Sequence, residues 1–341
     1  MRHWWWKVLC VLLLVYTAVV GLRTPLRPGL VSVTPTRIMP GPVSIKITGY
    51  NTIFKEDLGV WAWLENGGDS VCISPLSVVD ATHLKGTVTV PAGFRKPMTD
   101  LKVVSGIDGD LALYDAFYTE GRGNGVTSQG CGRMDASPVF TGTFPNRAIL
   151  NETIRNLFFH VPMWFSMIVL MGIAFVFSIM HLRSGSLDHD LAASVAVNVS
   201  LLFGALGIIT GSIWARATWG GWWTSDTKLN GSALTLLMYL AYVILRGSVP
   251  DAHKRARLAA VYNIFAFMLM LVFIMVLPRL TDSLHPGSGG NPAFSQYDLD
   301  DSLRAVFYPA CAGWILLGIW AYNLRLRHGR INAQLHENES H

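Results

Sequence analysis

A short stretch of the chain is unusually rich in tryptophan, with four indoles in ten residues. An aromatic belt at a membrane surface needs only about one or two indoles per helix end. The denser cluster predicts a flat apolar surface that can fold onto a planar ligand such as a porphyrin. The adjoining charged residues could bind the charged edge of that ligand. The candidate residues are Trp214, Trp219, Gly220, Trp222 and Trp223, with Arg216, Asp226 and Lys228 as the charged groups.

Two histidines flank this stretch along the chain, His160 and His285. Neutral imidazole is a good iron ligand, and a pair of histidines can bind heme iron from both faces. Pro162 and Pro286 fix the local backbone beside each candidate ligand. Apart from an isolated His83, the other histidines are predicted to be solvated on the opposite side of the membrane: His3, His181, His189, His253, His328, His336 and His341.

The composition predicts a membrane protein, and its membrane spans would hold the candidate residues in position. The chain is 51% hydrophobic and only 14% charged, whereas soluble domains carry about a quarter charged residues. The apolar residues cluster in runs of membrane length. The predicted spans are 8–22, 157–182, 191–214, 233–245 with an earlier start, 258–277 and 305–324. No small-x-small cleavage site follows the first run, so it is interpreted as an uncleaved span rather than a signal peptide.

Basic residues are distributed unequally between the two sets of loops. Cytoplasmic loops carry the excess of Lys and Arg in membrane proteins, which predicts that both termini are cytoplasmic. The richer set contains Arg2, Lys7, Arg183, Arg246, Lys254, Arg255, Arg257, Arg325, Arg327 and Arg330. The tryptophan-rich stretch, His285 and the long segment after the first span are then predicted to be outside. The net charge of +5 comes without a basic tract interleaved with aromatics, which argues against nucleic-acid binding.

The outer segment after the first span is predicted to be all-β. Short β-rich runs alternate with Gly, Pro, Asn or Asp, a spacing typical of a small sandwich. The runs are 43–47, 60–64, 70–73, 87–90, 101–104 and 111–118. Residues 35–49 also resemble the opening of immunoglobulin-like TIG domains. No catalytic constellation stands out, which favours an interaction or spacing domain.

The predicted fold is therefore mainly α, a six-span transmembrane helical bundle with an extracytoplasmic immunoglobulin-like or TIG-like β-sandwich between spans one and two. The expected division is a first span (1–23), the β domain (24–119), a Gly- and Ser-rich tether (120–156), a five-span domain (157–326) and a cytoplasmic tail (327–341).

Cysteine is sparse in this chain. Cys10 and Cys311 lie in predicted spans as small apolar residues. Cys72 and Cys131 both lie in the outer segment, where an oxidising compartment permits a disulfide, but the sequence leaves their pairing open. The chain contains no Cys-x-x-Cys and no Cys-x-x-Cys-His, which excludes a thioredoxin-type reductant and a covalently attached heme.

The order of these landmarks resembles the heme-handling WWD-domain family of cytochrome c biogenesis, in particular its six-span CcmC-type members. The resemblance covers about 151–326 and the first span. It implies that His160 and His285 are axial ligands of heme iron, and that Trp219, Trp222, Trp223 and Asp226 cradle the heme. Two departures bear on the pocket: Ser225 replaces the usual aromatic before the aspartate, and Lys228-Leu229-Asn230 replaces the usual Arg-Leu-Thr.

The function implied by the resemblance is a transfer or assembly factor rather than an enzyme. It would hold heme b non-covalently and transiently, and present it on the outer face to a heme chaperone of the CcmE kind. The implied partners also include an ATP-binding cassette transporter and small single-span subunits. Two other classes remain open: a membrane redox protein that keeps a bis-histidine heme and exchanges electrons with quinone, and a small-molecule transporter.

Overall fold

The computed structural model describes residues 4–119, 123, 125, 131, 142–147, 150–285 and 298–339, without the side chains of residues 58 and 336–339. The chain divides into two compact units. One contains Met1–Arg23 and Thr153–His341, and the other contains Thr24–Glu152.

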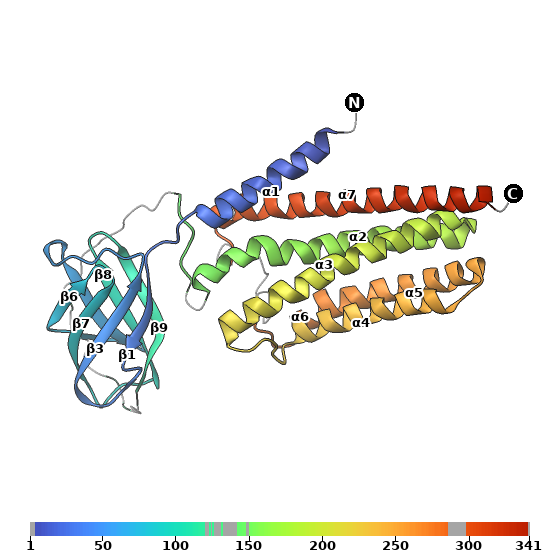
Figure 1. Cartoon of the computed structure of the whole chain (residues 1–341). Coiled ribbons are helices and arrows are strands. Elements are labelled where there is room, and N and C mark those ends of the chain that lie inside the picture. The colour runs from blue at the N-terminus through green and yellow to red at the C-terminus, as the bar shows by residue number, and fades with distance from the viewer. Residues whose placement is uncertain are drawn as a thin grey trace. The chain divides into compact units, whose positions relative to one another are not determined.

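The first unit is helical (Figure 1). Its helices are α1 (Trp5–Arg23), α2 (Leu157–Ser184), α3 (Leu187–Trp219), α4 (Thr227–Ser248), α5 (Ala252–Leu271), α6 (Leu277–Leu280) and α7 (Asp301–Glu339). A 3-10 turn, Asn151–Asn156, leads into α2, and a π-helical turn, Val272–Val276, joins α5 to α6. Among the described residues, six helical segments are long and apolar enough to cross a membrane, which confirms the six-span prediction.

Three helices differ from the predicted bounds. The fourth span does begin earlier, because Asp226 caps α4 and the helix starts at Thr227. The third span continues to Trp219, where Gly220 takes a left-handed conformation with φ of 79° and ends α3. Trp214 and Trp219 therefore lie on a helix rather than in a loop. The last helix continues to Glu339, so the predicted tail is helical over its described part.

Small residues let the helices approach closely. On α3, added Cβ atoms at Gly204, Gly207 and Gly211 would lie 2.9, 2.8 and 2.7 Å from Met167, Trp164 and His160 of α2. These glycines follow helical spacing and form one face, which we call the glycine face. Close packing against small residues is the usual basis of helix association in membranes. The glycine face therefore places the beginning of α2, including His160, directly against α3.

The first helix belongs to the same bundle. It packs along α7, and its buried Cys10 donates a hydrogen bond through Sγ to the carbonyl of Gly313 at 3.4 Å. An added Cβ at Gly313 would lie 3.1 Å from Leu14. This packing supports the interpretation of α1 as a retained span.

The second unit contains two sheets. The first has the order β1-β3-β7-β6 and the second β2-β9-β8-β4-β5. The strands are β1 (Gly29–Thr34), β2 (Arg37–Ile38), β3 (Gly41–Tyr50), β4 (Val60–Asn66), β5 (Asp69–Cys72), β6 (Leu76–Asp80), β7 (His83–Val90), β8 (Met98–Ser105) and β9 (Gly109–Thr119). Each predicted run lies in one of them or, for 70–73, overlaps one, whereas β1, β2 and β6 were not predicted. The likeness to TIG domains stays a prediction.

Both sheets contribute to one apolar core. Alternating side chains of each strand are buried, as expected for sheets with one covered face. The core includes Ile45 and Leu84 from the first sheet and Leu64, Leu101 and Phe117 from the second. The strands therefore form a unit with its own hydrophobic core.

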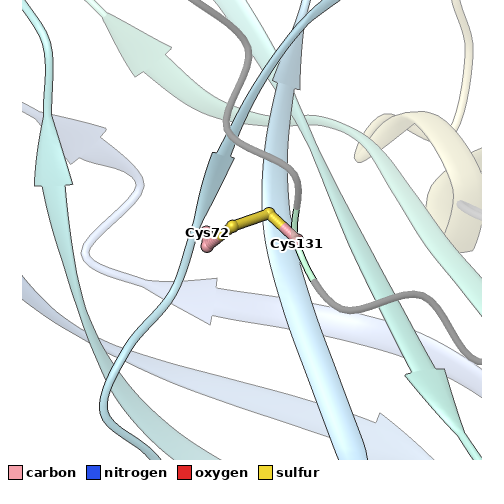
Figure 2. Close-up of a disulfide and its surroundings, with 2 residues drawn as sticks. All are labelled: Cys72 and Cys131. Carbon is pink, nitrogen blue, oxygen red and sulfur yellow. A yellow bond between two sulfur atoms is a disulfide. The ribbon is translucent and has the colours of Figure 1, made fainter.

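A disulfide joins Cys72, the last residue of β5, to Cys131 (Figure 2). The bond closes 59 residues of sequence, with the two Cα atoms 5.5 Å apart. This pairing was left open by the sequence. Cross-links over such distances stabilise a fold chiefly by restricting the unfolded chain.

Candidate functional site

His160 lies in the first turns of α2, against the glycine face of α3. Its ring meets the indole of Trp214 edge-on, with centroids 5.7 Å apart, and that of Trp164 at 6.4 Å. Its Nδ1 is 3.1 Å from the hydroxyl oxygen of Thr210, and this hydroxyl donates to the carbonyl of Leu206 at 2.7 Å. The Thr210 oxygen therefore accepts the Nδ1 proton. This tautomer leaves the lone pair on Nε2, the atom that would bind iron.

His285 comes from the loop that follows α6. Its Nδ1 lies 3.0 Å from Oδ1 of Asp226, and its ring meets the Trp219 indole edge-on at 5.2 Å. Burial and the nearby charge of Lys228 hold the pKa of His285 below its ordinary value, although Asp226 acts in the opposite direction. The imidazole is thus neutral near pH 7. A carboxylate at Nδ1 orients a ligating histidine and makes Nε2 more basic.

Asp226 is a buried residue that accepts several hydrogen bonds. Its side chain has no exposed area. Oδ1 accepts hydrogen bonds from the backbone N–H of Lys228 and Leu229 and thereby caps α4. Oδ2 accepts from the hydroxyl of Ser283 at 2.8 Å and from the N–H of Leu284 at 2.7 Å. The carboxylate therefore ties the start of α4 to the loop that carries His285.

The protonation state of Asp226 follows from these contacts. Burial alone would raise the pKa of this carboxyl, but the hydrogen bonds from Ser283, Leu284 and Leu229 outweigh burial and hold it below its ordinary value. Asp226 is therefore ionised. With both oxygens occupied, it does not reach outward to bind a ligand edge, which was one role considered for it from the sequence.

The four tryptophans fall into two pairs. Trp214 and Trp219 end α3, and each lies against one histidine. Trp214 Nε1 also donates to Thr153 Oγ1 at 3.0 Å. Trp222 and Trp223 follow in the short loop and are 62% and 42% exposed. One pair therefore supports the histidines, and the other presents apolar surface beside them.

One of the sequence departures has a side-chain partner in the structure. Asn230 accepts a hydrogen bond from Trp223 Nε1 at 3.2 Å, so this residue holds one indole of the exposed pair. Arg216 donates to the carbonyl of Gly220 and closes the end of α3 on itself. Arg216 is thus engaged within its own turn rather than aimed at a ligand edge. Lys228 is half-buried on the first turn of α4.

The imidazoles of His160 and His285 lie close enough to influence each other electrostatically, and Lys228 acts on both. Among the described residues, no group of three or more His, Cys, Asp or Glu side chains could hold a bare metal ion. Two imidazoles suffice for heme iron, because the porphyrin supplies the remaining four nitrogens. The donor set therefore fits a heme.

A close helix contact sets the position of His285. An added Cβ at Gly231 of α4 would lie 2.5 Å from the backbone oxygen of Phe273 in the π-helical turn. The hydroxyl of Thr281 donates a hydrogen bond to the hydroxyl of Thr227 at 3.0 Å. Two residues further along the chain, the hydroxyl of Ser283 donates to Asp226. π-Helical turns often occur at functional sites. Here the turn, α6 and the loop that follows are fastened to the start of α4.

Several supporting residues were missed by sequence reasoning. The Asp226-Thr-Lys-Leu sequence before an apolar run is a helix-start signal that would have identified the cap. No local signal marks Gly231, Thr210 or Ser283, because their partners lie far away in sequence. The prediction that His181 is solvated was wrong. Its side chain is buried, with Nδ1 2.8 Å from the carbonyl of Ser186, because it closes the α2–α3 connection.

Comparisons with known proteins find relatives of this part of the chain. The family model for heme exporter protein C matches residues 138–339, more than half of the chain. Heme exporter protein C of Bradyrhizobium diazoefficiens is 36% identical over 119 residues, which cover 33% of this chain and 43% of the relative. The Paracoccus denitrificans protein of the same name is 27% identical over 175 residues, covering 51% and 72%.

A further relative carries a different name. Cytochrome c-type biogenesis protein CcmF of Haemophilus influenzae is 30% identical over 221 residues, covering 60% of this chain and 32% of that protein. The chain thus aligns with less than half of the Bradyrhizobium and Haemophilus proteins. The matched family segment contains both histidines, the tryptophans and Asp226. This multi-pass membrane chain belongs to the heme exporter protein C family.

Proposed function

We propose that this protein binds heme between His160 and His285 and hands it on for cytochrome c maturation. The relatives are named for heme export and cytochrome c biogenesis, which supports a role in heme handling. We propose that the heme is heme b, held non-covalently, because the chain has no Cys-x-x-Cys-His attachment sequence.

One observation carries the proposal: two imidazoles from distant segments lie within range of each other's electrostatic influence, and Nδ1 of each is already hydrogen-bonded. In these tautomers each Nε2 carries the lone pair that an iron ligand needs. Trp214 and Trp219 support the imidazoles from the side, and the exposed Trp222 and Trp223 offer surface on which a porphyrin can stack. The chain's own groups therefore supply both axial ligands and an aromatic platform.

The two ligands are held with unequal rigidity, which suggests an order of release. His160 lies on a long helix packed against the glycine face. His285 lies on a loop fastened by Asp226 and Ser283. We propose that an incoming ligand first replaces His285 on the heme iron, and that His160 dissociates from the iron last. Ligand exchange needs no nucleophile or general base, consistent with an assembly factor rather than an enzyme.

The surroundings of the site complete the proposal. We propose that the protein lies in the bacterial inner membrane with both termini in the cytoplasm, and that the histidines and the β unit face outward. The excess of Lys and Arg in the opposite loops supports this orientation. The proposed acceptor is a heme chaperone of the CcmE kind. An ATP-binding cassette transporter and small single-span subunits are proposed as further partners.

A reduced-minus-oxidised spectrum of the purified protein, recorded before and after incubation with the apo-chaperone, tests the proposal. We expect a low-spin heme signal below one heme per chain that moves to the chaperone. A stoichiometric heme that cycles reversibly and stays in place would instead identify a redox protein. Absence of heme after expression in heme-replete cells would contradict both and favour a transporter.

A further inference from the structure

A groove of about 430 Å³ lies between α4 and α5, where α4 ends and α5 begins. This is the end of both helices opposite to Asp226 and the histidines. The residues of α5 that line the groove follow helical spacing and form a stripe about 12 Å long. The lining residues are Leu245 of α4 and Arg257, Leu258, Val261, Tyr262 and Phe265 of α5. We call this feature the α4–α5 groove.

The walls of the α4–α5 groove are apolar and exposed at the surface of the helical unit. Val261 and Phe265 are 54% and 67% exposed, although the segment Ala252–Leu280 is long and apolar enough to cross a membrane. The hydroxyl of Tyr262 already donates to the carbonyl of Met238 on α4 at 2.9 Å. In a bilayer these walls contact hydrocarbon. The groove therefore fits an acyl chain.

Arg257 is the one charged residue among the six that line the groove, and it is exposed. It has no ion-pair partner among the described residues. Two neighbouring arginines are engaged within the fold. Arg246 binds both carboxylate oxygens of Asp190 at 2.5 and 2.8 Å, and Arg255 donates to two backbone carbonyls of the α4–α5 connection. Within the described part of the chain, the groove thus combines apolar walls with a cation that lacks a counter-ion.

We infer that the α4–α5 groove binds an acidic phospholipid, with an acyl chain against Val261 and Phe265 and the phosphate on Arg257. The ends of membrane spans lie at the depth of the lipid head groups. A guanidinium pairs with phosphate through two parallel hydrogen bonds. Basic pockets between membrane spans are suited to anionic head groups for this reason. The inference is independent of heme binding, because it concerns the other end of α4 and α5.

Native mass spectrometry of the detergent-purified full-length protein tests the head-group contact. Phosphatidylglycerol is compared with phosphatidylcholine that carries the same acyl chains, so that the two lipids differ in head group alone. The variants are Arg257→Gln and Arg257→Lys. Arg183→Gln is the matched control, because Arg183 is exposed near the end of α2 and does not line the groove. Like Arg257, it has no ion-pair partner among the described residues.

We expect wild-type protein to bind phosphatidylglycerol about tenfold more tightly than phosphatidylcholine, because a hydrogen bond to a charged group contributes on that order. Arg257→Gln should remove this preference, and Arg257→Lys should keep part of it, since an ammonium lacks the guanidinium geometry. Arg183→Gln should resemble wild type. An unchanged preference in Arg257→Gln, or an equal loss in both glutamine variants, would overturn the inference.

Filling the groove tests the acyl-chain contact. Val261→Trp places an indole in the groove, whereas Leu237→Trp adds an indole at a 61% exposed position of α4 that does not line it. Val261→Trp should weaken binding of both lipids, and Leu237→Trp should weaken neither. Unchanged lipid binding in Val261→Trp would contradict the inference. A wild-type dimer that Val261→Trp converts to a monomer in size-exclusion chromatography would also contradict it, because a second copy of the chain would then occupy the groove.

Discussion

Asp226 joins two segments that are more than fifty residues apart in sequence. The same carboxylate caps α4, accepts from Ser283 and Leu284, and holds Nδ1 of His285. Helix caps alone contribute about 1 kcal/mol. A buried carboxylate with this many donors is far harder to replace, because each orphaned donor carries its own desolvation penalty.

Asp226→Asn is expected to weaken heme binding by roughly 10- to 100-fold, the usual effect of losing the residue that supports a metal ligand. Asparagine can still cap α4, but its amide nitrogen cannot accept from Ser283 or Leu284. Spectral titration measures the loss. Asp251→Asn is the matched control, because Asp251 caps α5 by accepting from Lys254 N–H and lies on a segment that carries neither candidate ligand. Equal losses in both variants would contradict the special role of Asp226.

The histidine pair gives a second residue-level prediction. His160→Ala or His285→Ala alone should retain some heme with an altered spectrum that added imidazole restores, since stacking and the other ligand remain. The double variant should lose most of the heme. If the double variant kept an unchanged low-spin spectrum, other groups would hold the iron. The measurement is the reduced-minus-oxidised spectrum with and without imidazole.

The two histidines could be selected from sequence because they flank a distinctive tryptophan cluster. Their partners could not, because Thr210 and Asp226 are recognised only through long-range geometry. The role of Asp226 was only partly predicted. The sequence indicated that it belongs to the site, but not that its carboxylate would be buried beneath His285.

At the scale of elements, α3 and the α5–α6 junction determine the site. The end of α3 was predicted too early, since apolar character fades before Trp219 while the helix continues to the left-handed Gly220. The π-helical turn between α5 and α6 has no sequence signal of its own. The glycine face could have been noticed from the spacing of Gly204, Gly207 and Gly211.

Gly231→Ala is expected to separate α4 from the π-helical turn, because the new methyl group would lie 2.5 Å from a backbone oxygen that cannot move alone. Heme affinity should fall severalfold and the melting temperature should drop. Helix propensity alone would make the alanine variant more stable by about 1 kcal/mol. A lower melting temperature would therefore show that the contact with Phe273 outweighs helix propensity.

Gly247→Ala on the same helix is the matched control, since nothing lies within 4 Å of an added Cβ there. This variant should bind heme normally and melt no lower than wild type. Thermal unfolding and Soret titration of both variants give the comparison. If Gly231→Ala behaved like Gly247→Ala, the contact with Phe273 would not position His285.

At the scale of the whole molecule, the β unit lies outside most of the family match. The family model for heme exporter protein C starts at residue 138, after the last strand of the described residues, β9. The β unit has its own core and a disulfide, and among its described residues no cluster of three metal-binding side chains occurs. We therefore propose that it serves in docking rather than heme binding.

Replacing Pro28–Gly142 with a short flexible linker should leave the heme spectrum intact and lower the yield of mature cytochrome c. All candidate ligands and platform residues remain in such a variant. Heme-stained gels measure the yield, and the purified variant is examined spectroscopically. A truncated protein without heme would show that the β unit belongs to the site.

The proposed orientation can be tested by labelling single cysteines in intact cells. Val79→Cys on β6 and Lys254→Cys near the start of α5 are both exposed positions. A membrane-impermeant maleimide should label the first and not the second until the cells are opened. Labelling of both from outside would break the six-span orientation, and labelling of the second alone would invert it.

The shared carboxylate of Asp226 also has a thermodynamic consequence. The hydrogen bonds of Asp226 order both the first turn of α4 and the loop that carries His285. Heme binding and local unfolding of these two segments are therefore linked equilibria. Heme at a hundredfold excess over its dissociation constant would raise the free energy of this local unfolding by about 2.7 kcal/mol. Slower hydrogen exchange of the backbone amides of Leu229 and Leu284 would therefore indicate heme-bound protein. An acceptor that removes the heme must supply the same free energy by which heme stabilises these two segments.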